Sequence, residues 1–159
     1  MVIKIIAVGK LKEKYLREAF SEYEKRLSAF CRLTVDEVEQ EKLPDEPSEK
    51  EINKALETEA ERILAKIPAG SYVIPMCIEG KQFSSEKFSE LIARETANGK
   101  NTFVFIIGGS CGLSERVKQK ADFRLSMSEM TFPHRLARIM LAEQLYRAFA
   151  IINNRKYHK

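Results

Sequence analysis

A glycine-rich loop is the segment whose residue types are most typical of a ligand site. Its sequence from Gly108 to Gly112 is Gly-Gly-Ser-Cys-Gly, after an apolar run and before a short helical pattern. The glycines could bring the backbone close to a ligand or adopt positive φ angles. The loop matches neither G-x-G-x-x-G nor G-x-x-x-x-G-K-S/T, which disfavours the usual dinucleotide and triphosphate folds. A turn that serves only backbone geometry is the alternative interpretation.

A second segment with chemical potential is SMSEMTFPH, residues 126–134. It joins a strand-like run to a helix that begins at Pro133, and small polar residues alternate in it with apolar ones. This pattern would suit enclosure of a planar ring by apolar side chains and backbone hydrogen bonds. The alternative is a loop that caps the following helix, with Thr131 or Phe132 near the cap.

The C-terminal tail, residues 153–159, combines cations with Tyr157 and the titratable imidazole of His158. Such side chains can pair with phosphate, stack on a base and transfer a proton. The competing interpretation is an ordinary solvated and frayed end.

Composition limits the class of protein. The 159 residues are 44% hydrophobic and 31% charged, as in one soluble globular domain. Three widely spaced cysteines and two histidines give neither a disulfide framework nor a metal-ligand spacing, so we expect chemistry without a metal. No apolar run approaches the roughly 20 residues that cross a bilayer, and no signal-peptide pattern is present. We therefore expect a cytoplasmic protein with no membrane partner.

Basic residues are unevenly distributed along the chain. Residues 1–70 carry 13 basic and 15 acidic side chains, whereas residues 71–159 carry 14 and 8. A basic C-terminal half points toward a polyanion such as RNA, because phosphate contacts supply most non-specific nucleic-acid affinity. An ordinary solvated basic face is the alternative.

Alternating strand and helix patterns must position these segments. Strands are predicted at 2–8, 33–38, 72–78, 102–107 and near 123–127, and helices at 14–27, 48–67, 85–97, 114–121 and from Pro133. Continuous apolar strands between helices indicate an α/β fold with a mostly parallel sheet covered on both faces. Ligands of such sheets bind beyond the carboxyl ends of the strands, which selects the loops 76–81, 108–112 and 127–132.

The last helix has two apolar stripes. One contains Leu141, Leu145 and Phe149, and the other contains Leu136, Ile139 and Met140 together with Glu143. If one stripe faces the sheet, the other needs a second partner. A homodimer interface is the simplest partner, and full burial within a monomer is the alternative.

Five motifs occur in a fixed order along the chain. They are Gly80-Lys81, Ile107-Gly108-Gly109-x-x-Gly112-Leu113-Ser114, Ser128-x-x-Thr131-x-Pro133-His134, residues 142–148 (AEQLYRA) and Tyr157-His158. Together they resemble the SPOUT-class methyltransferases that modify N3 of a pseudouridine in 23S ribosomal RNA. The resemblance covers essentially the whole chain. It implies one SPOUT domain with a C-terminal trefoil knot within about residues 71–159. It also implies a homodimer with its active site at the subunit boundary, and 23S rRNA on the assembled ribosome as substrate.

The resemblance also assigns roles to individual residues. S-adenosylmethionine would be surrounded by Met76, Gly108, Gly109, Met127, Ser128, Glu129, Met130, Thr131 and Phe132. The candidates near the target nucleotide would be His134, Glu143, Arg147, Tyr157 and His158. Four positions depart from the family pattern, namely Cys77, Ser110, Cys111 and Lys159, and a lysine in place of arginine makes the role of Lys159 less secure.

Methyl transfer from a sulfonium needs alignment and removal of the N3 proton more than it needs a metal. Either His158 or Glu143 could accept that proton, and Arg147 could stabilise the anionic base. Two other classes remain open at this level. One is a noncatalytic ribosome-binding or RNA-binding module, and the other is an α/β enzyme that holds a small nucleotide's phosphate at residues 108–112.

Overall fold

A five-stranded parallel sheet forms the centre of the computed structural model, which describes residues 1–157. The strand order is β2-β1-β4-β3-β5, and all four neighbouring pairs are parallel. The strands are β1 (Val2–Val8), β2 (Arg32–Val38), β3 (Tyr72–Gln82), β4 (Thr102–Ile107) and β5 (Leu125–Ser126). The helices are α1 (Lys14–Leu27), α2 (Glu49–Leu64), α3 (Ser85–Ala97), α4 (Glu115–Lys118) and α5 (His134–Ile152).

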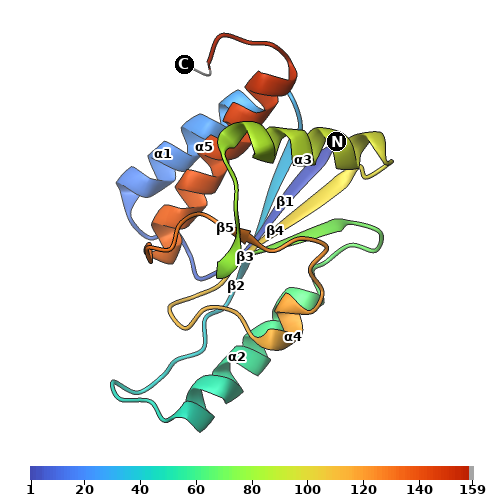
Figure 1. Ribbon diagram of the computed structural model, residues 1–159. Coiled ribbons are helices and arrows are strands. Elements are labelled where there is room, and N and C mark those ends of the chain that lie inside the picture. Colours follow the sequence, from blue (N-terminus) through green and yellow to red (C-terminus); the bar gives the residue numbers. More distant parts are fainter. Residues whose placement is uncertain (158–159) are drawn as a thin grey trace.

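Helices cover both faces of the sheet, as the apolar strands predict. Figure 1 shows α1, α3 and α5 on one face and α2 and α4 on the other. Alternate residues of each strand supply the two cores, so Ile3 and Phe105 pack toward α1, α3 and α5, whereas Ile6 and Val104 pack toward α2 and α4. Because both faces are buried, a one-residue slip in register would leave the side chains of the strand buried. It would, however, move each of them into the core on the wrong face of the sheet.

Most predicted elements are confirmed, and Ser48 and Glu51 form the predicted capping box at the start of α2. The largest difference is β3, which continues to Gln82 instead of ending near residue 78. Its register on β5 shifts, so that Met76 and Lys81 both pair with Leu125. The polar residues Glu79-Gly80-Lys81 look like a loop in sequence, but the Lys81 amide donates a hydrogen bond to the Arg124 carbonyl at 2.9 Å.

Smaller differences occur at element ends. α2 ends at Leu64 rather than near residue 67, α4 is limited to Glu115–Lys118, and β5 contains two residues. These ends carry few buried side chains, so periodicity has little signal there. The fold class itself, a mostly parallel sheet flanked by helices, is confirmed. Strand pairing does not define how the chain is threaded, so the trefoil knot stays a prediction.

Gly80 has a packing requirement that generates a testable prediction. A Cβ at this position would lie 2.7 Å from the carbonyl carbon of Leu125 and 2.9 Å from the amide nitrogen of Ser126. We expect Gly80→Ala to separate β3 from β5 and to lower the free energy of unfolding by about 1–3 kcal/mol, the usual cost of overpacking. Thermal denaturation would measure this loss.

Gly70→Ala is the matched control, because a Cβ there meets no atom within 4 Å and only its φ of +74° is unfavourable. An equal or smaller effect at Gly80 than at Gly70 would contradict the close contact with β5.

Candidate functional site

The register of β3 brings the three predicted loops together. Met76 pairs with Ile107 of β4 on one side and with Leu125 of β5 on the other. Gly108 follows Ile107 directly, and Met127 follows Leu125 by two residues. The loops after β4 and β5 therefore begin on either side of Met76, at the carboxyl edge where parallel sheets bind ligands. The segments 108–112 and 127–132 are loops at this edge, as predicted, whereas residues 76–81, predicted as a loop, belong to β3; that the three segments bind a ligand stays a prediction.

The glycine loop is folded tightly on itself. Gly109 and Gly112 form an isolated antiparallel bridge, in which the Gly112 amide donates to the Gly109 carbonyl at 3.1 Å. Gly112 has a φ of +80°, and a Cβ at Gly108 would lie 2.6 Å from the Gly112 carbonyl carbon. A Cβ at Gly109 would lie 3.2 Å from Cγ1 of Val8. Backbone geometry thus explains Gly108 and Gly112, and close side-chain neighbours explain Gly109, so that a compact turn of main-chain polar groups lies at the edge.

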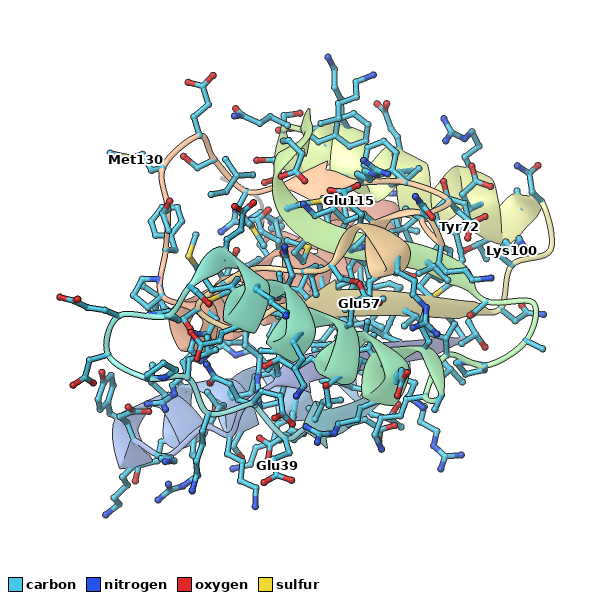
Figure 2. The ribbon with its side chains drawn as sticks, turned by 90° about the horizontal axis from the view of Figure 1, so that it is seen from below. Glu39, Glu57, Tyr72, Lys100, Glu115 and Met130 are labelled. Atoms are coloured by element: carbon cyan, nitrogen blue, oxygen red, sulfur yellow. The ribbon has the colours of Figure 1, made fainter. Side chains whose placement is uncertain are left out.

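The loop after β5 contains its own hydrogen bonds. The Ser126 hydroxyl donates to the Ser128 carbonyl at 3.0 Å, and the Met130 amide donates to the Ser128 hydroxyl at 3.0 Å. Met130 is 72% exposed, and Figure 2 shows it on the outer bend of the loop. Thr131 and Phe132 lie directly before Pro133, the N-cap of α5, as the helix-capping interpretation expects, but no side chain makes a capping hydrogen bond to that helix.

A cavity of about 500 Å³ lies between this loop, α3, α5 and α1. Ser126 and Met127 line it from the loop side, and Glu143 and Gln144 line it from α5. Its volume lies within the range of small-molecule sites, roughly 300–1,000 Å³. Met76, Gly108 and Gly109 do not line it, so the cavity joins the third loop to Glu143 and does not include all predicted cofactor residues.

Glu143, Arg147 and Tyr157 are brought together as the sequence motifs suggest. Arg147 donates from Nε and Nη2 to Oε1 of Glu143 at 3.0 and 2.7 Å, and the Tyr157 hydroxyl lies 3.5 Å from the same oxygen. Oε2 of Glu143 accepts from Gln144 at 2.7 Å. The hydrogen bond to Glu143 raises the pKa of Arg147, which therefore stays cationic. The carboxylate is thus already engaged as an acceptor on both oxygens.

The described part of the tail is packed, not frayed. The Tyr157 ring stacks edge-on against Tyr146 at 4.6 Å between centroids, and the Arg147 guanidinium lies 4.9 Å from the centre of the Tyr157 ring. The Arg147 cation and the rings of Tyr157 and Tyr146 therefore lie together at the end of α5 that carries Glu143. His158 and Lys159 lie outside the described residues.

His134 lies apart from this group. Nine residues of α5 separate it from Glu143, which is about 14 Å along a helix. Its Nε2 is buried without a hydrogen-bond partner among residues 1–157, at 3.5 Å from the position of a Cβ on Gly9. Burial, and then the charges of Arg135 and Arg138, lower the pKa of His134, so the imidazole is neutral at pH 7.

A buried arginine fixes the start of α5. The Arg138 side chain is 3% exposed and donates to Oε1 of Glu37 at 2.8 Å and to the Gly9 carbonyl at 2.9 Å. The helix that follows the third loop is thus held to the ends of β1 and β2. Periodicity did not identify Arg138, because a charged residue on an amphipathic helix is usually solvated.

Tyr23 of α1 was also missed as a site residue. It lines the cavity beside Glu143, and burial raises its pKa. In sequence it continues the apolar spacing of Lys14–Leu27, so it is indistinguishable from an ordinary core position.

Within residues 1–157, no group of three or more His, Cys, Asp or Glu side chains is arranged to hold a metal ion. No helix in that range is long and apolar enough to cross a membrane.

The fold and the converging loops agree with the comparison with known families. A family model described as "Predicted SPOUT methyltransferase" matches residues 1–158. The chain therefore belongs to the SPOUT methyltransferase family, as its motifs indicate.

Individual relatives are similar over their full lengths. The chain is 50% identical to ribosomal RNA large subunit methyltransferase H of Carboxydothermus hydrogenoformans over 159 residues, all of both chains. It is 52% identical to the protein of the same name from Clostridium botulinum, again over all of both chains. The solved structure of "a probable methylase family protein" from Haemophilus influenzae Rd KW20 has the same fold. It matches 99% of this chain and 70% of that chain, with a TM-score of 0.51 and 16% identity.

The buried position of Arg138 predicts a large loss of stability on truncation. Arg138→Ala would remove the donor to the Gly9 carbonyl and one of the two donors to Oε1 of Glu37, which is 34% exposed and also accepts from the Leu11 amide, so we expect the free energy of unfolding to fall by about 1–3 kcal/mol. Denaturant unfolding would measure it. Lys14→Ala is the control, because its pair with Glu18 is exposed and should contribute at most about 1 kcal/mol. Similar losses in the two variants would refute the structural role of Arg138.

Proposed function

We propose that this chain uses S-adenosylmethionine to methylate N3 of a pseudouridine in 23S ribosomal RNA, on the assembled ribosome and in the cytoplasm. Membership of the SPOUT family and full-length relatives named ribosomal RNA large subunit methyltransferase H support the reaction class and the RNA. The observation that carries the proposal to this site is the double pairing of Met76, which gathers the three loops at one edge of the sheet.

The loops suit S-adenosylmethionine in chemical type. Met76, Gly108, Gly109 and the segment 127–132 would hold it with main-chain polar groups and thioether or aromatic side chains. When bound, S-adenosylmethionine supplies a methyl group that is already activated by its sulfonium. The residues of this chain then need to orient the target base, exclude water and remove one proton from N3.

Arg147 and Glu143 have different roles in this reaction. Arg147 is cationic and lies beside the aromatic ring of Tyr157, so it can stabilise the anion that forms when N3 loses its proton. Glu143 fixes the guanidinium through two hydrogen bonds. Since both Glu143 oxygens already accept hydrogen bonds, its first role is to orient Arg147, and His158 is the rival acceptor of the proton.

The active form is a homodimer. Leu141, Leu145 and Phe149 are buried inside one chain, whereas Leu136 on the second stripe of α5 is 39% exposed. Ile139 and Met140 of that stripe line the open cavity. A second copy would cover these side chains and close the cavity beside Glu143.

Calorimetry with S-adenosylmethionine and with nucleoside phosphates tests the cofactor first. The proposal expects binding of S-adenosylmethionine alone. Binding of nucleoside phosphates instead would favour the small-nucleotide enzyme, and RNA binding without either ligand would favour the noncatalytic module.

Methyl transfer should depend on the tail. We expect His158→Ala to reduce incorporation of labelled methyl into large-subunit RNA, from a strain that lacks the enzyme, by at least about 10²-fold if the imidazole accepts the proton. Tyr157→Phe, which keeps the ring and removes the hydroxyl, tests separately whether the contact of that hydroxyl with Glu143 contributes to transfer. Full activity of His158→Ala together with loss in Glu143→Gln would move the proton acceptor to Glu143.

Sedimentation at micromolar concentration tests the dimer. The parent chain should show twice the mass of one chain, and Leu136→Glu should shift it toward the monomer because a charge would be buried at the interface. Asn53→Glu adds the same charge to an exposed position on α2, on the opposite face of the sheet, and should remain dimeric. A monomeric parent that still methylates RNA would refute the dimer.

A further inference from the structure

The segment after β2, residues 39–41, has no regular structure but is held firmly by α2. Oε1 of Glu59 accepts a hydrogen bond from the Glu41 amide at 2.9 Å, and Glu59 is 6% exposed. Arg62 donates to the Glu39 carbonyl at 2.9 Å and forms an ion pair with Glu41 at 2.6 Å. Two residues of α2 therefore fix the backbone on both sides of Gln40. Figure 2, which views the α2 face, labels Glu39 at the edge of this region.

The Gln40 side chain extends from this segment, residues 39–41, to the glycine loop, residues 108–112. Its Nε2 donates to the Ser110 hydroxyl at 3.2 Å, across a separation of 70 residues in sequence. The same nitrogen lies 3.3 Å from the position that a Cβ on Gly109 would take, and Oε1 lies 3.5 Å from the corresponding position on Gly9. The amide of Gln40 thus fills the space between the end of β1 and the loop after β4.

The glycine loop needs such a support. Ser110 and Cys111 at its tip are exposed, and glycine backbone is intrinsically the most flexible. The bridge between Gly109 and Gly112 closes the turn on itself but does not connect it to the rest of the sheet. Gln40 makes that connection to Ser110, on the β1 side of β4, opposite the β3 side on which Met76 lies.

We propose that Gln40 is a positioning residue for the cofactor loop, held by Glu59 and Arg62 and holding Gly109 and Ser110 in the conformation that receives S-adenosylmethionine. The inference rests on the proposed function for the identity of the ligand. This proposal adds a fourth segment, residues 39–41 after β2, to the three segments identified from the sequence. It also gives α2 an indirect role in the site, because Glu59 and Arg62 of α2 hold that segment.

The test compares the full-length parent with Gln40→Ala and Ser110→Ala. Loss of one supporting hydrogen bond should weaken S-adenosylmethionine binding in calorimetry by about three- to tenfold, with the change appearing chiefly in KM for the cofactor. The double variant should bind no more weakly than the weaker single one, since both remove the same contact. Gln119→Ala, which removes the same side chain from an exposed position on the α4 side, should leave affinity unchanged.

Hydrogen exchange without ligand gives an independent measurement. The Gly112 amide, which is bonded to Gly109, should exchange several-fold faster in Gln40→Ala and in Arg62→Ala, while amides of the β4 core keep their protection. If Gln40→Ala lowers the melting temperature, Ser110→Ala carries the test, because it changes an exposed residue.

The outcomes separate the two proposals. A parent that fails to bind S-adenosylmethionine would overturn the proposed cofactor, whereas faster exchange at Gly112 would still support the positioning role of Gln40. A parent that binds, with unchanged affinity and unchanged exchange in Gln40→Ala, would overturn the positioning role alone. Fully additive effects of the two substitutions would also overturn it.

Discussion

The site depends on one strand making two different pairings at its carboxyl end. β3 lies between β4 and β5, and Met76 is the residue at which it pairs with both. Beyond Met76 the strand leaves β4 but returns to Leu125 through Lys81, and Gly80 permits the close backbone approach. This second pairing adds to the contact of Met76 with Leu125 in fixing the start of the loop after β5 relative to the glycine loop. The position of that loop therefore depends on backbone pairing as well as on its own side chains.

The fold was predictable because its elements repeat a strong pattern. Buried strands such as Thr102–Ile107 are almost continuously apolar. The start of α2 is predicted by the spacing of Ser48 and Glu51, which form a capping box in the structure. The second pairing of β3 was not predictable, because Lys81 and Gln82 are polar and pair through their backbone. Backbone pairing between polar residues leaves no trace in hydrophobic periodicity.

In the site, too, some features were predictable from the sequence and others were not. The three loops follow from the rule that parallel sheets bind ligands at their carboxyl edge. The grouping of Glu143 with Arg147 follows from helical spacing, whereas the same spacing separates His134 from them. Gln40 had no signal at all, since an amide in a polar loop can meet Ser110 only through the tertiary fold. Long-range polar contacts of this kind are the part of a site that a single sequence does not contain.

The position of β1 between β2 and β4 also bears on how the chain folds during synthesis. β1 is the first strand made, yet one of its two neighbours is β4, and Val2 pairs with Thr102, 100 residues later. Until residues 102–107 have left the ribosome, the emerging chain can form the β1–β2 pair but must leave one edge of β1 unpaired and apolar. Contacts of such large sequence separation slow folding, and an open apolar edge favours association with other chains. A nascent chain of this protein therefore exposes that edge of β1 until residues 102–107 have been synthesised.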